Sequence, residues 1–189
     1  MQGPELEAKG QSFHSVLAAF EELRGPALVA AVKQEIGGEF GEALRFGSLL
    51  PSGWYPVAWY RELFKTGAEL APDVLNMGRE AGRLSGAREI RGIYKVIFRA
   101  LSTETIALQA PRLFKLFYSG GKVEVLESNK KFARVHYSEC FGFDRHLWQD
   151  LLGGAESIFA ATGAKDLRIR VEEGGGNGDH QMLTTATWD

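Results

Sequence analysis

The run KVEVLESNKKFARVHYSECFGFDRHLWQDLLGGAESIFAATGAKDLRIRVEEGGGNGDHQMLTTATW, residues 122–188, decides the fold of this chain. Three of its segments alternate apolar and polar residues with a period of two, as half-buried antiparallel strands do: 122–127, 132–137 and 167–171. After the glycine-rich loop 174–179, the segment 182–188 can return as the second strand of the second hairpin. Between the second and third segments, Asp144 can cap a helix that runs to about residue 162, which Gly163 can end in a left-handed conformation. The sequence therefore predicts two hairpins and one helix in the order ββαββ, with both hairpins in one sheet.

The chain upstream of this unit has the pattern of helices that would cover one face of the sheet. Ser12 can cap a first helix, in which apolar residues recur at steps of three and four, and a second helix begins with a proline. We therefore expect an α+β fold whose helical N-terminal half packs on the C-terminal antiparallel sheet. Residues 1–11 are expected to form a disordered tail and residues 12–189 one domain, with 12–118 mainly helical and 119–189 holding the sheet and its crossing helix.

Composition places the chain among soluble globular domains. Its 189 residues are 44% apolar and 24% charged, which suffices for a sizeable core. No uninterrupted apolar run reaches about eighteen residues, and the acidic N-terminus lacks a secretory pattern, so we expect a cytoplasmic protein without a membrane span. The single cysteine, Cys140, excludes an intrachain disulfide and a multi-cysteine zinc site.

Charge is distributed in bands along the chain. Residues 76–134 hold 12 basic and 5 acidic side chains, whereas residues 1–75 hold 6 and 10, and residues 135–189 hold 4 and 9. The bands can neutralise one another in the fold, or the basic band can present a positive face to an acidic partner. The second interpretation centres on a predicted amphipathic helix over residues 88–101, whose polar face carries Arg88, Arg91, Lys95 and Arg99.

A glycine repeat marks the helical region 72–87. Gly78, Gly82 and Gly86 recur at intervals of four and would form one smooth groove on a helix. Such a groove favours close packing of another helix, although a ligand could also lie along it. The spacing matches neither the dinucleotide-binding nor the P-loop fingerprint.

Aromatic side chains predict a second kind of site, a pocket between the sheet and the helices. The segment 49–60 is the richest in aromatics, and a later helix that starts near residue 103 and is kinked or split by Pro111 carries more of them. The expected pocket walls are Trp54, Tyr94, Phe98, Phe114, Phe117 and Trp148. An aromatic cluster can equally be the wedge of a packed core, and the sequence leaves both possibilities open.

The order of elements, with the strings RLFKLFYSGGKVEVLE, SECFGF and FAATGAKDLRIRVEE and the final Trp188, resembles the bacterial 4-vinyl reductase-like domains. These are similar to a ligand-binding superfamily that also contains heme nitric-oxide sensors and vesicle-tethering trafficking subunits. The resemblance covers residues 49–188 and is nearest to a group of myxobacterial single-domain proteins of about this size. It implies a mixed helical and antiparallel fold with a ligand-binding or regulatory role.

The functional residues of these relatives do not recur in this chain. Heme sensors of the superfamily use Tyr-x-Ser-x-Arg and an axial histidine on a helix, whereas this chain has Tyr137-Ser138-Glu139-Cys140 without the arginine. His136 falls on a predicted strand and His146 in the first turn of the crossing helix. In the related phenol-sensing activators, several cysteines near the last helix and the last strand bind zinc. The corresponding regions of this chain, residues 158–159 and 182–183, contain no cysteine. The sequence thus predicts neither a cofactor nor a metal, although Cys140 could correspond to the lipid-modified cysteine of the trafficking subunits.

No catalytic constellation stands out. Cys140 with His136 or His146 is a weak pair of the kind that arises by chance, and no apolar pocket is implied around Asp150 or Glu156. We therefore expect a non-enzymatic protein, and two hypotheses for its function remain. One is a regulatory module that binds an acidic protein through the basic helix and forms a homodimer. The other is a small-molecule sensor that binds an apolar ligand between sheet and helices.

Nucleic acid is an unfavourable partner because the net charge is -2.

Overall fold

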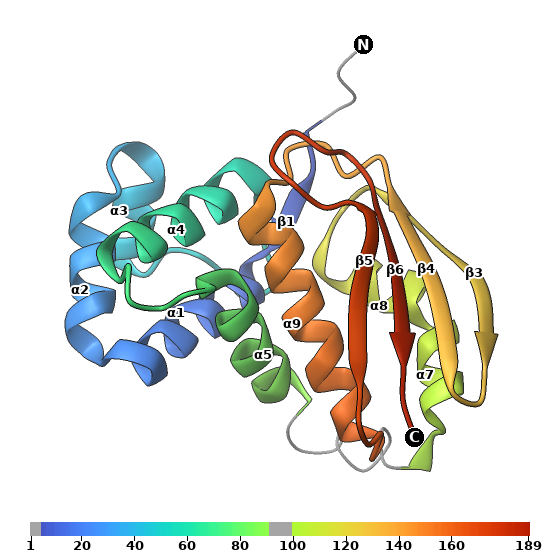
Figure 1. The fold of residues 1–189 in the computed structure, drawn as a ribbon. Coiled ribbons are helices and arrows are strands. Elements are labelled where there is room, and N and C mark those ends of the chain that lie inside the picture. Colours follow the sequence, from blue (N-terminus) through green and yellow to red (C-terminus); the bar gives the residue numbers. More distant parts are fainter. Residues whose placement is uncertain (1–4, 91–99) are drawn as a thin grey trace.

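A computed structural model describes residues 5–90 and 100–189, and it confirms the expected α+β class (Figure 1). The N-terminal half comprises β1 (Glu7–Lys9), α1 (Gly10–Arg24), α2 (Pro26–Glu35), α3 (Gly38–Phe46), β2 (Trp54–Pro56), α4 (Val57–Leu70) and α5 (Met77–Glu89). The C-terminal half comprises α7 (Thr103–Leu108), α8 (Ala110–Phe117), β3 (Lys122–Asn129), β4 (Phe132–Ser138), α9 (Arg145–Ala161), β5 (Arg168–Gly174) and β6 (Met182–Thr187). Pro111 stands in the first turn of α8 and separates it from α7, as predicted.

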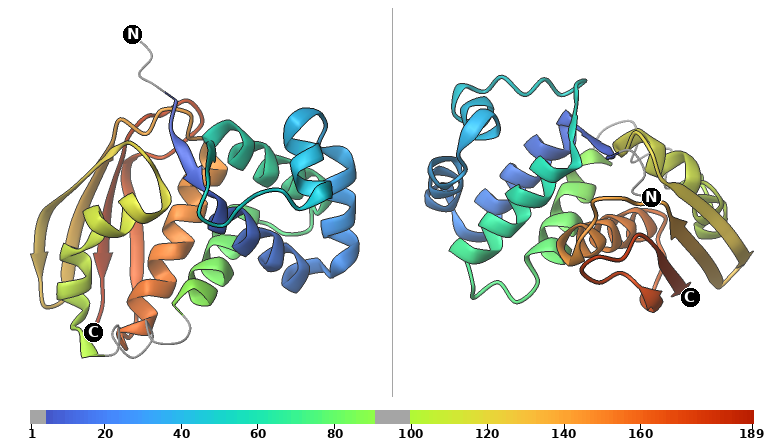
Figure 2. Two further views of the ribbon diagram at one scale, coloured as in Figure 1. Left: turned by 180° about the vertical axis from the view of Figure 1, so that it is seen from behind. Right: turned by 90° about the horizontal axis from the view of Figure 1, so that it is seen from above.

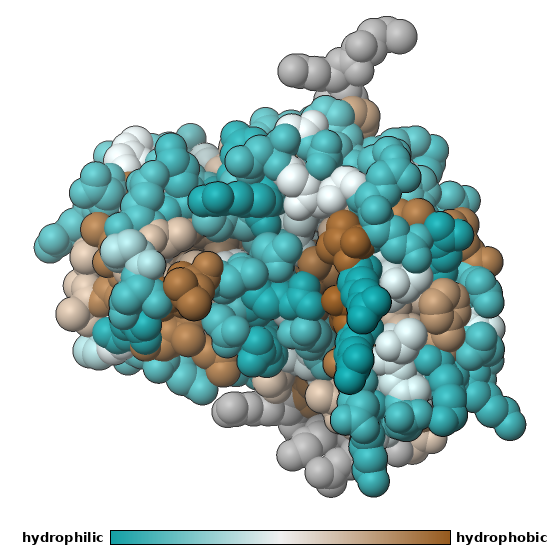
Figure 3. Space-filling view, in the orientation of Figure 1, coloured by the Kyte–Doolittle hydropathy of each residue, from teal (hydrophilic) through white to brown (hydrophobic). Residues whose placement is uncertain are grey.

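Both C-terminal hairpins belong to one antiparallel sheet of order β3-β4-β6-β5. β4 joins them by pairing with β6, from Phe132 opposite Thr187 to Tyr137 opposite Met182. Residues on one face of these strands are buried, Val135 among them, and the other face is polar and partly exposed. Figure 2 shows α7, α8 and α9 against the buried face, and Figure 3 shows the opposite side, where hydrophilic residues predominate.

The helix α9 has the ends that its sequence predicts. Asp144 Oδ1 accepts hydrogen bonds of 3.0 Å from the backbone N–H groups of His146 and Leu147, which caps the helix. Gly163, just beyond its end, has a φ of +89°, a conformation that glycine adopts without strain. Local capping chemistry therefore sets the length of the helix that crosses the sheet.

Glycines let α5 and α9 approach closely, and this confirms the packing interpretation of the glycine repeat. A Cβ atom at Gly82 would lie 2.2 Å from the main-chain oxygen of Asp150, and one at Gly78 would lie 2.4 Å from that of His146. From the other helix, a Cβ atom at Gly153 would lie 2.2 Å from the Arg79 oxygen. Two helix backbones thus pass at a distance that side chains would prevent.

The expectation of a disordered tail over residues 1–11 is wrong for residues 7–11. Glu7–Lys9 form β1, which pairs with β2, and α1 begins at Gly10 rather than after Ser12. The short strand is held because Leu6 and Ala8 are 3% and 0% exposed in the core. Three residues are too few to show an alternating pattern, so periodicity carries no strand signal here.

The charge bands neutralise one another where the structure describes them. Cations of the basic band form ion pairs with acids of the flanking bands: Arg79 and Arg83 with Glu156, Arg88 with Glu22, Lys122 with Glu139, Lys131 with Asp189 and Arg134 with Glu172. Most of these pairs are partly exposed and contribute little to stability individually. None of the helices within the described residues is both long enough and apolar enough to cross a bilayer.

Candidate functional site: a cavity with one polar end

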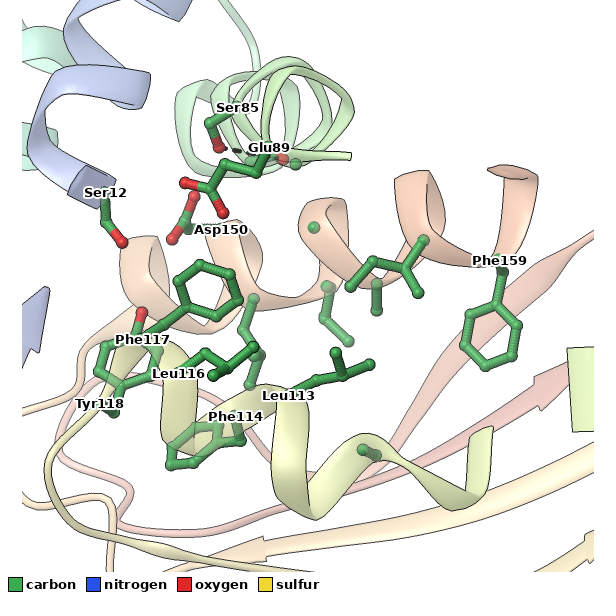
Figure 4. Close-up of a pocket in the computed structure, with 18 of the residues that line it drawn as sticks. Ser12, Ser85, Glu89, Leu113, Phe114, Leu116, Phe117, Tyr118, Asp150 and Phe159 are labelled. Atoms are coloured by element: carbon green, nitrogen blue, oxygen red, sulfur yellow. Dashed lines mark hydrogen bonds between the residues drawn. The ribbon is translucent and has the colours of Figure 1, made fainter. Parts of the chain in front are cut away.

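A cavity of about 570 Å³ lies between the buried face of the sheet and the helices α5, α7, α8 and α9 (Figure 4). This volume is within the range of small-molecule pockets, which is about 300 to 1,000 Å³. Most of its lining is apolar. Leu113, Phe114 and Phe117 come from α8, Ile158 and Phe159 from α9, Ile106 from α7, and Val135, Ile169 and Ala186 from the sheet.

Polar groups gather at one end of this cavity. Asp150 of α9, Glu89 of α5, Ser12 of α1 and the hydroxyl of Tyr118 lie at this end in Figure 4, and Phe159 lies at the other. Asp150 is 8% exposed, and its Oδ2 accepts a 3.1 Å hydrogen bond from the Tyr60 hydroxyl. We call Ser12, Tyr60, Glu89, Tyr118 and Asp150 the polar end.

Burial keeps the ionisable groups of the polar end in their neutral forms. Desolvation raises the pKa of Asp150 to about 8, and the nearby charge of Glu89 raises it further while the Tyr60 hydrogen bond opposes both effects. Burial also raises the pKa of Glu89 to about 7. The pKa values of Tyr60 and Tyr118 are raised well above the usual range for the same reason. Both acids of the cavity therefore lose their protons close to neutral pH, Glu89 at a lower pH than Asp150.

Arg88 also contributes to the lining, but its hydrogen bonds lead away from the acids. Its Nη2 atom lies 2.5 Å from Glu22 Oε2 and 3.3 Å from the carbonyl oxygen of Ala18, both on α1. Within residues 5–90 and 100–189, no arginine or lysine forms an ion pair with Asp150 or Glu89.

The structure brings together only part of the pocket predicted from the aromatics. Phe114 and Phe117 line the cavity. Trp148 is fully buried beside it, with its ring 4.7 Å from that of Phe143. Trp54 lies on β2 under the ammonium group of Lys9, at 4.2 Å, away from the cavity. Tyr94 and Phe98 lie outside the described residues.

The predicted basic surface is described at a single position. Arg88 belongs to the last turn of α5 and is bound to Glu22 by the ion pair above. Arg91, Lys95 and Arg99, like most of the amphipathic helix expected over residues 88–101, lie outside the described part of the chain.

Cys140 is not placed for nucleophilic chemistry. Its side chain is fully buried, and burial raises the pKa of the thiol to about 12. His136 lies on β4 and faces Glu124, with 3.9 Å between Nδ1 and Oε2. A protonated thiol without a neighbouring base is a weak nucleophile.

Sequence reasoning missed the polar end of the cavity. It implied no apolar pocket around Asp150, and this is wrong because Asp150 lines the cavity. The sequence assigned Glu89 to the helix predicted over residues 88–101, whereas in the structure Glu89 is the last residue of α5. The sequence did contain one signal. Asp150 shares its helix face with Leu147, Gly154 and Ile158, at steps of three and four, so it is the one acid among apolar or small residues on that face.

Comparison with solved structures defines the fold as that of H-NOX domains. A mutant of the Fe(II) unliganded H-NOX protein from K. algicida superimposes with a TM-score of 0.73 at 14% identity, covering 96% of both chains. A point mutant of T. tengcongensis H-NOX gives a TM-score of 0.69 at 15% identity, covering 96% of this chain and 97% of that one. An oxygen-binding H-NOX domain related to soluble guanylate cyclases gives 0.66 at 14%, covering 96% and 95%.

The likeness to these H-NOX structures is one of fold. It supports the heme-nitric-oxide-sensor part of the resemblance seen in the sequence, and the 4-vinyl reductase-like part stays a prediction. No model of a known protein family matches the sequence. No curated protein matches it either.

The described lining of the cavity does not fit a heme, which the fold would imply. All four histidines lie in the described residues, and neither they nor Cys140 line the cavity; His14 instead donates from Nε2 to the Leu49 carbonyl oxygen at 2.7 Å. The lining tyrosines are kept protonated by burial, which makes them poor iron ligands. Two of the lining residues, Asp150 and Glu89, are acids, which would not offset the negative charges of heme propionates. No three His, Cys, Asp or Glu side chains of the described residues gather to hold a metal ion.

Proposed function

We propose that this protein is a small-molecule sensor that binds an organic ligand with an apolar body in the cavity between sheet and helices. The observation that carries the proposal is the cavity itself: about 570 Å³ of space with an apolar wall and one end bearing buried acids and hydroxyls. A partly open, mostly apolar cavity of this size can bury most of the surface of a small organic molecule.

The fold supports a ligand-binding role. The H-NOX structures with the same fold include one described as oxygen-binding and another that concerns heme distortion. For this chain we propose ligand binding on the same scaffold with an organic molecule in place of a heme, because the described lining lacks suitable iron ligands. We further propose that the protein is not an enzyme and acts through signalling, since the described lining offers no activated nucleophile.

Calorimetric titration with n-decanol, an uncharged apolar probe, tests the proposal. Ala155 lines the cavity from α9, so Ala155→Phe fills part of the space, whereas Ala160, exposed on the same helix, provides the matched control Ala160→Phe. We expect decanol to bind the wild-type chain and Ala160→Phe with equal affinity. In Ala155→Phe the affinity should fall at least about tenfold, or about 1.4 kcal/mol. Absence of binding to the wild-type chain, or equal binding to all three proteins, would refute a ligand cavity here.

The acidic-partner hypothesis remains a prediction. Arg88, the described member of the basic stripe, already forms an ion pair within the fold, and its partner Glu22 offsets its charge. A contact through Arg91, Lys95 and Arg99, and a homodimer, would need evidence from binding and mass measurements on the full chain.

A further inference from the structure

The polar end of the cavity contains acceptors that the fold does not use. Asp150 accepts one hydrogen bond, from Tyr60 to Oδ2, and no described residue donates to its Oδ1. Tyr118 is 5% exposed and lines the cavity, yet its hydroxyl makes no hydrogen bond with any described residue. Both oxygen atoms belong to side chains that line the cavity, so both can accept hydrogen bonds from a ligand group there.

The charge of this end selects among the possible ligand groups. Asp150 and Glu89 line the same end of the cavity from α9 and α5, and the charge of Glu89 is one of the causes that raise the pKa of Asp150. A carboxylate or phosphate head would oppose ionisation of the two acids and would gain no ion pair from them. A hydroxyl head would carry no charge to balance the ionised acids. A positive head would relieve their repulsion and let both acids ionise.

Aromatic rings stand beside the acids. Phe117 is the last residue of α8 and Tyr118 follows it, and Figure 4 shows both side chains next to Asp150 at the polar end of the cavity. The Phe114 ring stacks on that of Tyr118, with centroids 4.9 Å apart, which holds the tyrosine in place. Aromatic faces attract cations, and an ammonium group has three N–H donors for the free acceptors.

We infer that the cavity binds an organic cation, an amphiphile whose ammonium head lies between the two carboxyl groups and the α8 aromatics and whose apolar body extends toward Phe159. The inference rests on the proposed function and adds to it the chemical class of the ligand. Asp150 and Glu89 bind the head, Tyr60 orients Asp150 through its hydrogen bond, and the apolar wall selects the body.

Three probes with the same ten-carbon body test this inference: n-decylamine, n-decanol and decanoate, titrated calorimetrically into the full chain at about pH 7.5. We expect decylamine to bind about tenfold or more tightly than decanol, and decanoate to bind most weakly. In the isosteric double variant Asp150→Asn/Glu89→Gln, the advantage of the amine should vanish while decanol affinity stays the same. Asp166→Asn, an exposed position, controls for the loss of one negative charge.

The outcomes separate the two proposals. Equal binding of decylamine and decanol, or preference for decanoate, overturns the organic cation and leaves the apolar cavity standing. An amine preference that survives in the double variant also overturns it, because another site would then hold the head. If the double variant does not fold, Glu89→Gln alone must reduce the preference. Failure of all three probes to bind refutes the cavity function itself.

Discussion

Tyr60 Oη donates a hydrogen bond of 3.1 Å to Asp150 Oδ2 and so joins α4 to α9 across 90 positions of the sequence. Both side chains are buried, at 2% and 8% exposure, and the Tyr60 ring packs 4.9 Å from the ring of Phe13 on α1. The helical half and the sheet-crossing helix therefore meet at a polar contact that also borders the cavity.

Tyr60→Phe removes this hydrogen bond and keeps the ring. Because Asp150 would lose its partner in a buried position, we expect the free energy of unfolding to fall by about 1 to 3 kcal/mol. Urea denaturation measures it. In an Asp150→Leu background the same substitution should cost much less; an equal cost in both backgrounds would show that the contact with Asp150 is not responsible.

Two adjacent glycines of α9 should respond oppositely to alanine. A Cβ atom at Gly153 would lie 2.2 Å from the Arg79 oxygen, so Gly153→Ala should push α5 and α9 apart and lower stability by about 1 to 3 kcal/mol. At Gly154 the nearest atom would be 3.9 Å away, so Gly154→Ala should be neutral or stabilising by up to about 1 kcal/mol. Thermal unfolding compares them, and similar effects of the two substitutions would contradict the close helix contact.

Stability should decrease as pH rises through the neutral range. The pKa of Asp150 is raised from 3.8 to about 8 and that of Glu89 from 4.5 to about 7, so over this interval the unfolded chain has released protons that the folded chain still binds. Each group then lowers the free energy of unfolding by up to about 1.4 kcal/mol per pH unit until the pH passes its folded pKa. The titratable groups that interact with these acids are Tyr60 and Tyr118, and Arg88 lines the same cavity but is bound to Glu22.

Urea denaturation from about pH 5 to about pH 9 measures this slope. Asp150→Asn and Glu89→Gln cannot ionise, so each variant should show a flatter dependence than the wild-type chain, whereas Asp166→Asn should not. A wild-type stability that rises between about pH 5 and about pH 8, or variants with an unchanged slope, would contradict the neutral buried acids.

Cys140 should react slowly with thiol reagents in the folded protein. Its pKa of about 12 leaves almost no thiolate near neutral pH, and the side chain is fully buried. We expect labelling by a disulfide reagent to be slower than in the urea-unfolded chain by about a hundredfold or more. Similar rates in the folded and unfolded proteins would show that the thiol is accessible.

Sequence patterns predicted the parts of the fold that local chemistry dictates. Alternation indicated three of the four sheet strands, Asp144 and Gly163 marked the ends of α9, and the glycine spacing indicated close packing of α5 on another helix, which the structure identifies as α9. β1 was missed because its three residues are ordered by pairing with β2, a contact between distant segments.

The sequence predicted a cavity between the sheet and the helices, where it lies, but only some of the residues that line it. Phe114 and Phe117 line it because α8 packs beside the sheet, whereas Trp54 and Trp148 serve other contacts. Asp150 could not be assigned to the site from the sequence alone, because an acid on a helix is ordinarily solvated. Its burial depends on α4, α5 and α9 meeting, and no single segment encodes that arrangement.

Methyl NMR during titration with n-decylamine tests the central claim most directly, since it reports where a ligand binds. Ile106, Ile158 and Ile169 line the cavity from α7, α9 and β5, whereas Ile36 is buried in the distant helical core. We predict that the methyl resonances of the three lining isoleucines shift in a saturable manner and that the Ile36 resonance does not. Saturable shifts at Ile36 alone, or no shift at any lining isoleucine at saturating probe, would contradict a ligand cavity between the sheet and the helices.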